Sequence, residues 1–596
     1  MTSRRSIHAP LVAMLWLFAA AVSAAPAAAD TAPGDAGAQL QRFLDDEWER
    51  VLRESPETAT YLGDKRYNDR WSDVSLEAIA ASHAADRAAL QRLRQIPRAD
   101  LSVADQLNYD LFRHQLEESI EEYGFRQFLI PINQRGGIQT ADEILDLMRF
   151  ESTRDYADWL KRLESLPALI AQVEALMRQG IKEKRLNPRI VMQRIPAQIE
   201  KQLVDDPTQS PWYKPFQAVP AGVPEADKIR HEAEARRLIA EAVVPAFRRF
   251  HTFFQKEYLP ACPEAVGAWA QPDGKRLYAF LARSFTTTTL TPDQIHDIGQ
   301  REVKRIRAEM EAIKDQVGFK GTLAQFMAHL RTDPQFYFKT GDELFAAYLA
   351  LSKRIDPEMT RLFRLMPRLP YGVRAIPDNI APDTTTAYYM PGAADGTRAG
   401  YYYVNLYQPE ARPKYEMEAL TLHEAVPGHH FQIALAQELG ELPNFRKHGF
   451  GFTAYVEGWG LYAESLGEEL GLYQDPYSKF GALIYEMWRA VRLVVDTGMH
   501  HKRWSRQQAI DFFKANAAKS ELDIVNEVDR YIAWPGQALA YKIGQLKIRE
   551  LRTRAEKVLG ERFDVRGFHD IVLGSGAIPL DLLERNVDVW IKAQQG

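Results

Sequence analysis

Apolar residues recur at the spacing of an α-helix along most of this chain. From Ala38 to about Ser55 they fall on one helical face. A later stretch opens with Thr291-Pro292-Asp293, where a threonine can cap a helix and a proline fits its first turn. The segments with helical spacing are Ala38–Ser55, Leu76–Leu93, Val103–Tyr123, Thr140–Arg178, Ala226–Tyr258 and Thr291–Val317, and the pattern returns from Tyr415 almost to the end. The sequence therefore predicts a mainly α protein.

The segment from Met366 to Pro413 has a different pattern. It is rich in proline and glycine, and it contains Tyr388-Tyr389 and a run of tyrosines from Tyr401 to Tyr403 between turn residues. Aromatic residues between turn signals favour strands over helices. We therefore expect one hairpin or small β-sheet, directly upstream of a group of histidines. Its strand at Tyr401–Tyr407 has an edge to which an extended peptide could add.

Length and charge narrow the classes of protein. A chain of 596 residues is too long for one small core, so we expect two lobes, residues 30–275 and 276–596, which can interleave. Hydrophobic residues make up 46% and charged residues 26% of the sequence, as in ordinary globular proteins. The formal net charge of −5 provides no basic surface for nucleic acid. The sequence does not fix the oligomeric state.

The N-terminal residues have the parts of a secretory signal peptide. Arg4 and Arg5 precede an apolar run from Leu11 to Val22, and small residues follow it. The run is shorter than the ~20 residues that span a bilayer, so we expect cleavage near Ala29, with Ala24 as the second choice, and no stable membrane insertion afterwards. The mature protein would be periplasmic or secreted. The single cysteine, Cys262, excludes an internal disulfide and is interpreted as a buried structural thiol.

The strongest chemical signal is the segment HEAVPGHH, His423 to His430. Zinc peptidases commonly use HExxH, in which two histidines four residues apart bind the metal and the glutamate is the general base. Here the fourth position after His423 is Pro427. A two-residue bulge at Pro427-Gly428 would bring His429 to the place of the missing ligand, and His430 is the second choice. We therefore expect one Zn²⁺ ion bound by His423 and His429, with Glu424 as the base.

A third ligand is expected on the next helix, FTAYVEGWGLYAESL. Glu457 is the preferred ligand, and Glu464, seven residues later on the same face, is assigned to an outer position. Asp496 and His500 are the substitutes, although the favoured interpretation of His500 is a helix end. Glycines 458 and 460 would permit close approach to another helix.

Several of these motifs together resemble one family. HEAVPGHHFQ, EGWGLYAE, VVDTGMH and PGQALAYKIGQLKI, with LRESPETATYLGDKRYNDRWSD near the start, are similar to the bacterial domain of unknown function 885 family, over nearly the whole mature chain. That family is grouped with gluzincin metallopeptidases, which bind zinc through two histidines and a glutamate. The resemblance implies His423, His429 and Glu457 as ligands and Glu424 as base, in a helical fold around a deep cleft. The spacing in HEAVPGHH departs from the usual gluzincin motif.

The remaining candidates concern the substrate. Tyr541 is expected to stabilise the oxyanion, as a late tyrosine or histidine does in related helical zinc peptidases; a core tyrosine is the alternative. Arg530 can hold a substrate carboxylate, which would favour an exopeptidase, or form a salt bridge. Tyr403 and Asn405 are further candidates for substrate binding. The expected function is zinc-dependent hydrolysis of peptide bonds in short peptides. The alternatives are a zinc amidohydrolase that acts on another amide and a peptide-binding protein without turnover.

Overall fold

The computed structural model describes residues 36–377, 381, 386–392, 398–440, 442–448, 451–519 and 521–595. The expected signal peptide, residues 1–29, lies outside these residues. Within them the protein is mainly α with a single small sheet, which confirms the predicted fold class. None of the described helices combines the length and the apolar character needed to cross a membrane.

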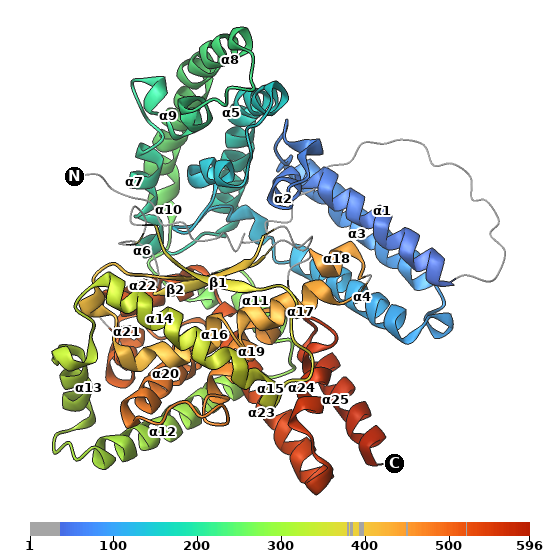
Figure 1. Ribbon diagram of the computed structural model, residues 1–596. Coiled ribbons are helices and arrows are strands. Elements are labelled where there is room, and N and C mark those ends of the chain that lie inside the picture. Colours follow the sequence, from blue (N-terminus) through green and yellow to red (C-terminus); the bar gives the residue numbers. More distant parts are fainter. Residues whose placement is uncertain are drawn as a thin grey trace.

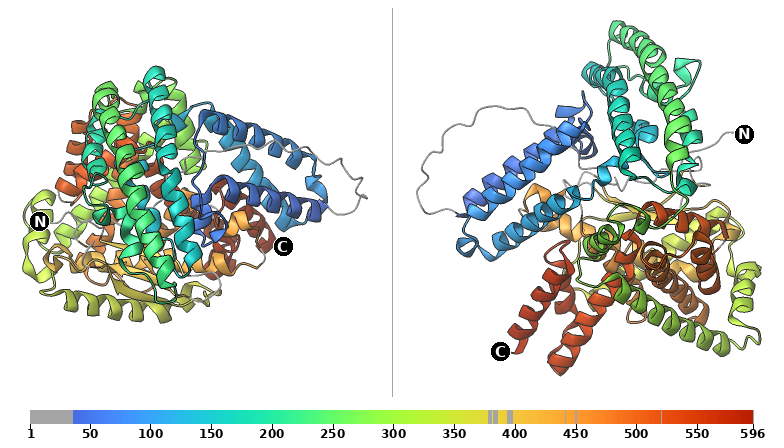
Figure 2. Two further views of the ribbon diagram at one scale, coloured as in Figure 1. Left: turned by 90° about the horizontal axis from the view of Figure 1, so that it is seen from above. Right: turned by 180° about the vertical axis from the view of Figure 1, so that it is seen from behind.

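The helices occupy three parts of the molecule (Figures 1 and 2). In Figure 1, residues 36–123 form the right-hand part, residues 153–261 form the upper part, and most of the chain from residue 274 onward forms the lower part. The helices before residue 290 are α1 (Ala36–Glu54), α2 (Pro56–Tyr61), α3 (Leu76–Gln95), α4 (Val103–Tyr123), α5 (Thr153–Glu183), α6 (Arg189–Met192), α7 (Ile195–Glu200), α8 (Glu225–Leu238), α9 (Val244–Phe253), α10 (Leu259–Ala261) and α11 (Gly274–Thr286).

The later helices include those that carry the histidine motif. They are α12 (Pro292–Gln316), α13 (Leu323–Thr332), α14 (Gly341–Ile355), α15 (Met359–Leu362), α16 (Met417–Glu424), α17 (His429–Glu438), α18 (Asn444–Lys447), α19 (Thr453–Ser465), α20 (Pro476–His500), α21 (Arg506–Asn516), α22 (Glu521–Ala533), α23 (Ala540–Leu559), α24 (Val565–Leu573) and α25 (Leu580–Gln595).

Local sequence signals account for most of these boundaries. Thr291 caps α12 as predicted: its side chain accepts a hydrogen bond from the Gln294 backbone, and the Gln294 side chain accepts one from the Thr291 backbone. The predicted helix Thr140–Arg178 was wrong in part. A 3₁₀ segment, Ile138–Asp146, precedes a break, and α5 begins only after Ser152, whose capping box with Asp155 starts a new helix.

The apolar core extends across residue 275, the predicted boundary between the two lobes. One buried cluster joins Trp159 and Phe247 from the first half to Val491 and Phe513 from the second. A second cluster surrounds α16, α19 and α23. The side chains of one cluster therefore come from both predicted lobes, and the division into lobes around a cleft stays a prediction. Cys262 is buried, which agrees with a structural thiol.

The sheet has three strands in the order β1-β3-β2. Strand β3 (Gly400–Val404) pairs in parallel with β1 (Tyr371–Ala375) and antiparallel with β2 (Ala387–Met390). The predicted tyrosine strand is thus the central one, so a peptide cannot add to it. That prediction was wrong because both sides of β3 already have a partner strand.

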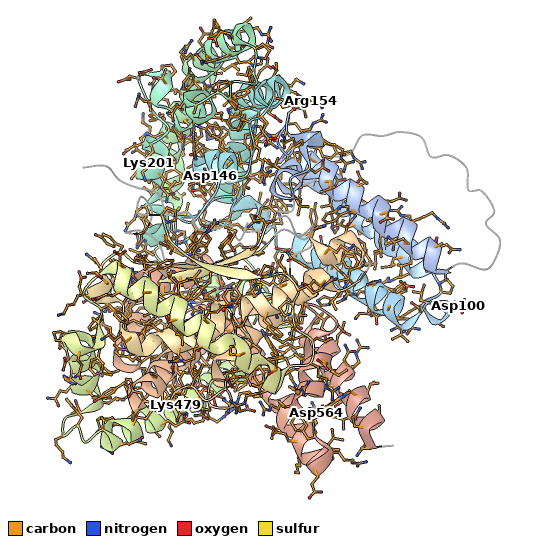
Figure 3. All side chains as sticks on the ribbon, in the orientation of Figure 1. Asp100, Asp146, Arg154, Lys201, Lys479 and Asp564 are labelled. Carbon is orange, nitrogen blue, oxygen red and sulfur yellow. The ribbon has the colours of Figure 1, made fainter. Side chains whose placement is uncertain are left out.

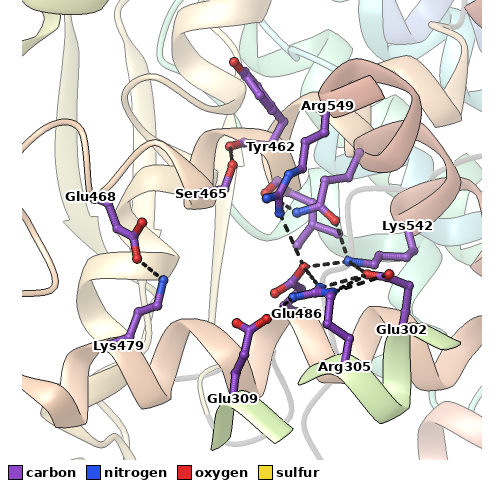
Figure 4. Close-up of polar contacts among 12 residues, drawn as sticks. Glu302, Arg305, Glu309, Tyr462, Ser465, Glu468, Lys479, Glu486, Lys542 and Arg549 are labelled. Atoms are coloured by element: carbon purple, nitrogen blue, oxygen red, sulfur yellow. Dashed lines mark hydrogen bonds and ion pairs between the residues drawn. The ribbon is translucent and has the colours of Figure 1, made fainter. Parts of the chain in front are cut away.

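A buried ion-pair network fixes α23 against α12 and α20 (Figure 4). Lys542 of α23 is fully buried, and its Nζ lies 3.0 Å from Glu302 Oε2 and 2.7 Å from Glu486 Oε1. Arg305 Nη2 lies 2.6 Å from the same Glu486 oxygen. Burial opposes ionisation of Glu486, but Lys542 and Arg305 outweigh it and lower its pKa to about 2. The network sets the position of the segment that contains Tyr541.

Candidate metal centre

The histidine motif lies on two helices with a break between them. Helix α16 ends at Glu424, and α17 begins at His429. Ala425 (φ −101°, ψ −108°) and Gly428 (φ −76°, ψ −129°) have non-helical backbone angles. The predicted bulge in a continuous helix is therefore an interruption of four residues, and the Val426–Pro427 peptide bond within it is cis. Trp459 Nε1 donates a 2.7 Å hydrogen bond to the Pro427 carbonyl oxygen and so ties the break to α19.

Only glycine fits at position 428. A Cβ atom there would lie 1.9 Å from the carbonyl oxygen of His423 and 2.3 Å from that of Leu422, both of them backbone atoms. The backbone at Gly428 therefore passes directly against the last turn of α16. His429, the first residue of α17, lies next to His423, with ring centroids 4.7 Å apart.

Three side chains converge at this point. Glu457 Oε2, from α19, lies 3.6 Å from His423 Nε2 and 3.6 Å from His429 Nε2. One nitrogen of each histidine and one oxygen of the glutamate all lie within 4.8 Å of one another. In the part of the chain that the structure describes, this is the one group of three or more such residues with metal-binding geometry.

The separations of these atoms fit a zinc ion. Ligand atoms about 2.1 Å from a tetrahedral ion lie about 3.4 Å apart, close to both measured distances. Two imidazole nitrogens and a carboxylate oxygen form a donor set that catalytic zinc sites use, with a fourth position left for water or substrate. His423, His429 and Glu457 therefore have the chemistry and the spacing to hold one Zn²⁺ ion.

The electrostatics show how closely the three side chains are coupled. Burial raises the pKa of Glu457, but the two histidines outweigh it and hold that pKa well below the usual range. Burial lowers the pKa of His423, while hydrogen bonds to Glu457 and Glu464 outweigh it and raise that pKa to about 10. A histidine binds a metal through a neutral imidazole nitrogen, so metal binding at His423 would release a proton from that ring.

Glu464 orients one of the histidines. Its Oε1 accepts a 2.8 Å hydrogen bond from His423 Nδ1, and this leaves Nε2 to face Glu457. Histidine ligands of metals commonly have such an outer carboxylate, which fixes the ring and its tautomer. The structure therefore places Glu464 in the outer position that the sequence suggested.

Glu424 is adjacent to the cluster and available for chemistry. It is the last residue of α16, directly after His423, and it is only partly buried. None of the described residues forms a hydrogen bond or ion pair with its carboxylate. Its charge acts on His423, which places the two groups close together.

His430, the second choice for a ligand, points elsewhere. Its Nδ1 lies 2.9 Å from the Tyr389 hydroxyl, and its ring packs on Tyr371 at 4.8 Å. Burial lowers its pKa to about 4, so the ring is neutral at pH 7. His430 therefore joins α17 to the sheet and does not belong to the cluster.

Asp496 and His500, the substitute ligands, belong to a different part of the core. His500 Nδ1 accepts a hydrogen bond from the Ala268 backbone, and its Nε2 lies 2.9 Å from the Tyr531 carbonyl oxygen. His500 is the last residue of α20, which agrees with its interpretation as a helix end, and its ring is buried. Asp496 Oδ1 accepts from the Tyr278 hydroxyl at 2.6 Å and from the Gly536 backbone at 3.1 Å.

The buried Asp496 carboxyl group should make the stability of the folded protein depend on pH. Burial outweighs its two hydrogen bonds and raises its pKa to about 7, against an ordinary value near 3.9. Between these values the folded protein keeps a proton that the unfolded chain has released, so this group makes the protein less stable as pH rises from about 4 to 7. In Asp496→Asn that dependence is absent. Denaturant unfolding at pH 5 and pH 8 should show the variant gaining stability relative to the wild type at the higher pH, with unchanged zinc content; a pH-independent difference would contradict this.

The residues proposed for substrate binding fall into two groups. Arg530 Nη2 lies 3.3 Å from the Tyr541 hydroxyl and 2.8 Å from Gln537 Oε1, so these two candidates contact each other. Asn405 is instead buried, where it donates to the Ala381 carbonyl oxygen and accepts from the Tyr407 backbone. Tyr403 stacks on Tyr388 in the sheet. The structure thus gives Asn405 and Tyr403 contacts that organise the sheet.

The sequence did not single out Arg489, which also reaches the cluster. Arg489 Nη2 lies 3.7 Å from Glu464 Oε1, the oxygen that accepts from His423. The sequence signal that could have identified Arg489 is a charged residue within the long, largely buried helix α20. The predicted close approach at glycines 458 and 460 is confirmed: Gly458 packs on Gly544 of α23, and Gly460 faces the His423 ring.

Gly460→Ala is expected to weaken zinc binding. The added Cβ would lie 2.8 Å from His423 Cε1 and 3.0 Å from Nε2, so the imidazole must move, although alanine favours the helix itself by about 1 kcal/mol. Loss of ligand orientation typically costs 10- to 100-fold in metal affinity, and we expect about that effect in a zinc titration. Gly222→Ala is the control, because nothing lies within 4 Å of its Cβ. Equal zinc affinity in both variants would contradict the prediction.

The fold and the cluster together define a class: a mainly α protein with a buried two-histidine, one-glutamate centre suited to a metal ion. A family model described as bacterial protein of unknown function (DUF885) matches residues 56–587. The chain therefore belongs to the DUF885 family, as the sequence motifs indicated. No curated protein matches the sequence.

Two solved structures show the same fold. A protein from Colwellia psychrerythraea, named a "putative lipoprotein", is 29% identical with a TM-score of 0.86, and the match covers 94% of this chain and 100% of that one. A "putative lipoprotein of unknown function" from Shewanella oneidensis is 18% identical with a TM-score of 0.72, over 92% and 99% of the two chains. The second likeness concerns the fold alone.

Proposed function

We propose that this protein is a zinc-dependent peptidase that hydrolyses peptide bonds in short peptides. One observation carries the proposal: ligand atoms of His423, His429 and Glu457 converge at separations that suit zinc, beside a glutamate whose carboxylate has no partner among the described residues. The relation of this family to gluzincin peptidases, which the resemblance implies, supports the same reaction.

Each residue of the site has a role in this proposal. A bound zinc ion would supply a Lewis acid that polarises the scissile carbonyl and acidifies water. Glu424 accepts the proton of the attacking water and passes it to the leaving amine. Glu464 holds His423 in orientation. Tyr541 precedes by one helical turn the point where α23 packs on α19 at Gly544, and we assign its hydroxyl to the developing oxyanion.

We also infer that the protein is exported. The basic residues, apolar run and small-residue exit at the N-terminus support export, and so do the relatives named as lipoproteins. We propose that the mature protein is periplasmic or secreted. Peptides in that compartment would be its substrates.

The test combines metal analysis with hydrolysis. Purified protein should contain about one zinc per chain, cleave members of a short-peptide library, lose that activity on treatment with a chelator, and regain it with zinc. Stoichiometric zinc without cleavage of any peptide would favour hydrolysis of another amide. Binding of peptides with no turnover of either class would favour a binding protein. A protein that takes up no zinc would refute the proposal.

A further inference from the structure

A group of buried arginines lies one helical turn from the contacts of the metal centre. Helix α20 carries Arg489, which contacts Glu464, and Arg492 three residues later. Successive turns of a helix are about 5 Å apart along its axis. Arg492 is therefore about one turn of α20 from the arginine that contacts Glu464, and an extended peptide advances about 3.4 Å per residue.

Arg492 is buried yet has an unused donor. Its Nε donates to the Tyr531 hydroxyl at 2.9 Å and its Nη2 to Glu527 Oε2 at 3.0 Å. Its guanidinium stacks over the Tyr541 ring, 4.3 Å from the centroid. Its Nη1 is buried and has no hydrogen-bond partner in the described chain, although the residue is only 4% exposed. A buried charged group with an unpaired hydrogen-bond donor destabilises the fold unless a ligand accepts that hydrogen bond.

Arg530, on the neighbouring helix α22, is also largely buried beside Tyr541, and one of its donors is unpaired among the described residues. It contacts Tyr541 and Gln537, and its Nη1 lies 3.4 Å from Glu527 Oε1, while its Nε is buried and without a partner among the described residues. Glu527 thus lies between Arg492 and Arg530. Burial opposes its ionisation, but the two arginines outweigh it and lower its pKa to about 2.

A third arginine adds positive charge from the first half of the chain. Arg135 lies in a turn whose Gln134 side chain donates to the Asp529 backbone of α22. Desolvation and the charge of Arg530 lower its pKa to about 10, although its side chain remains exposed. Arg135, Arg492 and Arg530 carry three positive charges around the single negative charge of Glu527; Asp529 is already paired with Arg194 and Arg506. Two positive charges are therefore in excess, and an accessible side chain stands beside them.

From this excess of charge and these unused donors, we propose that Arg492 and Arg530, with Arg135 beside them, bind the free C-terminal carboxylate of the peptide substrate. Two guanidinium groups present planar donors that match a carboxylate. The inference rests on the proposed peptidase function and deepens it: with its terminus held here, a short peptide would extend toward the metal centre, and the enzyme would be an exopeptidase that requires a free C-terminus.

Paired substrates test the proposal on the wild-type protein. Tetrapeptides made as free acids and as C-terminal amides should differ by about 10- to 100-fold in kcat/KM, the worth of a charge-assisted hydrogen bond. Equal hydrolysis of both forms would overturn the carboxylate site and leave the peptidase intact. If amides that carry a glutamate side chain are cleaved as well as the free acids, the site takes a side-chain carboxylate and the terminal assignment is wrong.

Variants then connect the preference to the arginines. Arg530→Gln should remove most of the 10- to 100-fold ratio of kcat/KM between free acids and amides. Its absolute rates can fall for both substrates, because Arg530 also contacts Tyr541, so the ratio is the quantity to compare. Arg530→Lys should retain part of that ratio. Arg154→Gln is the control: its side chain is 80% exposed at the start of α5, far from α20 and α22 (Figure 3). An unchanged preference in folded Arg530→Gln would contradict the proposal.

A binding measurement separates this inference from the peptidase function. Zinc-loaded Glu424→Gln protein should bind tetra-alanine about 10- to 100-fold more tightly than tetra-alanine amide by calorimetry. If the wild type cleaves no peptide but this difference is present, the carboxylate site stands and the proposed function fails. If the two ligands bind equally, the carboxylate site is refuted whatever the activity.

Discussion

Glu424→Gln is expected to reduce kcat for peptide hydrolysis by about 10²- to 10⁴-fold while zinc stays bound. Glutamine has nearly the same shape but cannot accept the proton of water, so the general base alone is lost. The three ligand side chains are unchanged, and the Glu424 carboxylate contributes no hydrogen bond or ion pair to the described part of the fold. Steady-state kinetics and elemental analysis on the same sample measure both quantities.

The matched control is a glutamate outside the candidate site. Glu410→Gln changes an exposed glutamate in the loop after the sheet and should have wild-type kinetics. Full activity in Glu424→Gln would exclude this residue as the base. Loss of zinc together with activity would mean that Glu424 supports the ligands, and the assignment of base would then need another residue.

The second large effect distinguishes two neighbouring histidines. His429→Ala removes a nitrogen that faces Glu457 Oε2, so we expect zinc affinity to fall by more than the 10- to 100-fold that outer partners typically contribute. His430→Ala should retain zinc, because that ring contacts Tyr371 and Tyr389. The His430→Ala variant should be less stable than the wild type, because the substitution leaves a cavity between α17 and the sheet. Zinc titration and thermal unfolding of both variants measure the two effects.

The opposite result for the two histidine variants would change the assignment of the metal ligands. If His430→Ala lost zinc and His429→Ala kept it, the break between α16 and α17 would have a different geometry from the one described. The ligand set would then change with it. The matched pair of substitutions is informative because the two residues are adjacent in sequence and alike in chemistry, and only their orientation differs.

Local sequence patterns were sufficient for most of the helices. Helix α4 begins and ends where its apolar spacing predicted, and α12 starts at the Thr291 cap. The segment Thr140–Arg178 failed because Ser152 and Asp155 form a capping box inside it. A cap competes with helical spacing through backbone hydrogen bonds, and periodicity alone does not detect that competition.

The candidate site also depends on contacts between distant elements, which local sequence patterns do not reveal. The spacing in HEAVPGHH identified His423, His429 and Glu424, and Glu457 followed from a pair of acids on one helical face. The sequence could not decide between a bulge and a full break, because the break depends on the contact of Trp459 with the Pro427 carbonyl and on the space around Gly428. Arg492 and Arg135 were not singled out, since nothing in the linear sequence brings them to Arg530.

The sequence by itself determined the fold class, the residue types of the candidate centre and the family to which the chain belongs. These follow from local periodicity and from short motifs whose chemistry is fixed by residue type and spacing. Only the tertiary structure decided that β3 is a central strand, that His430 faces the sheet and that three arginines from distant segments surround Glu527. Such facts depend on packing between elements far apart in the chain, where contact and burial choose among side chains that the sequence leaves equivalent.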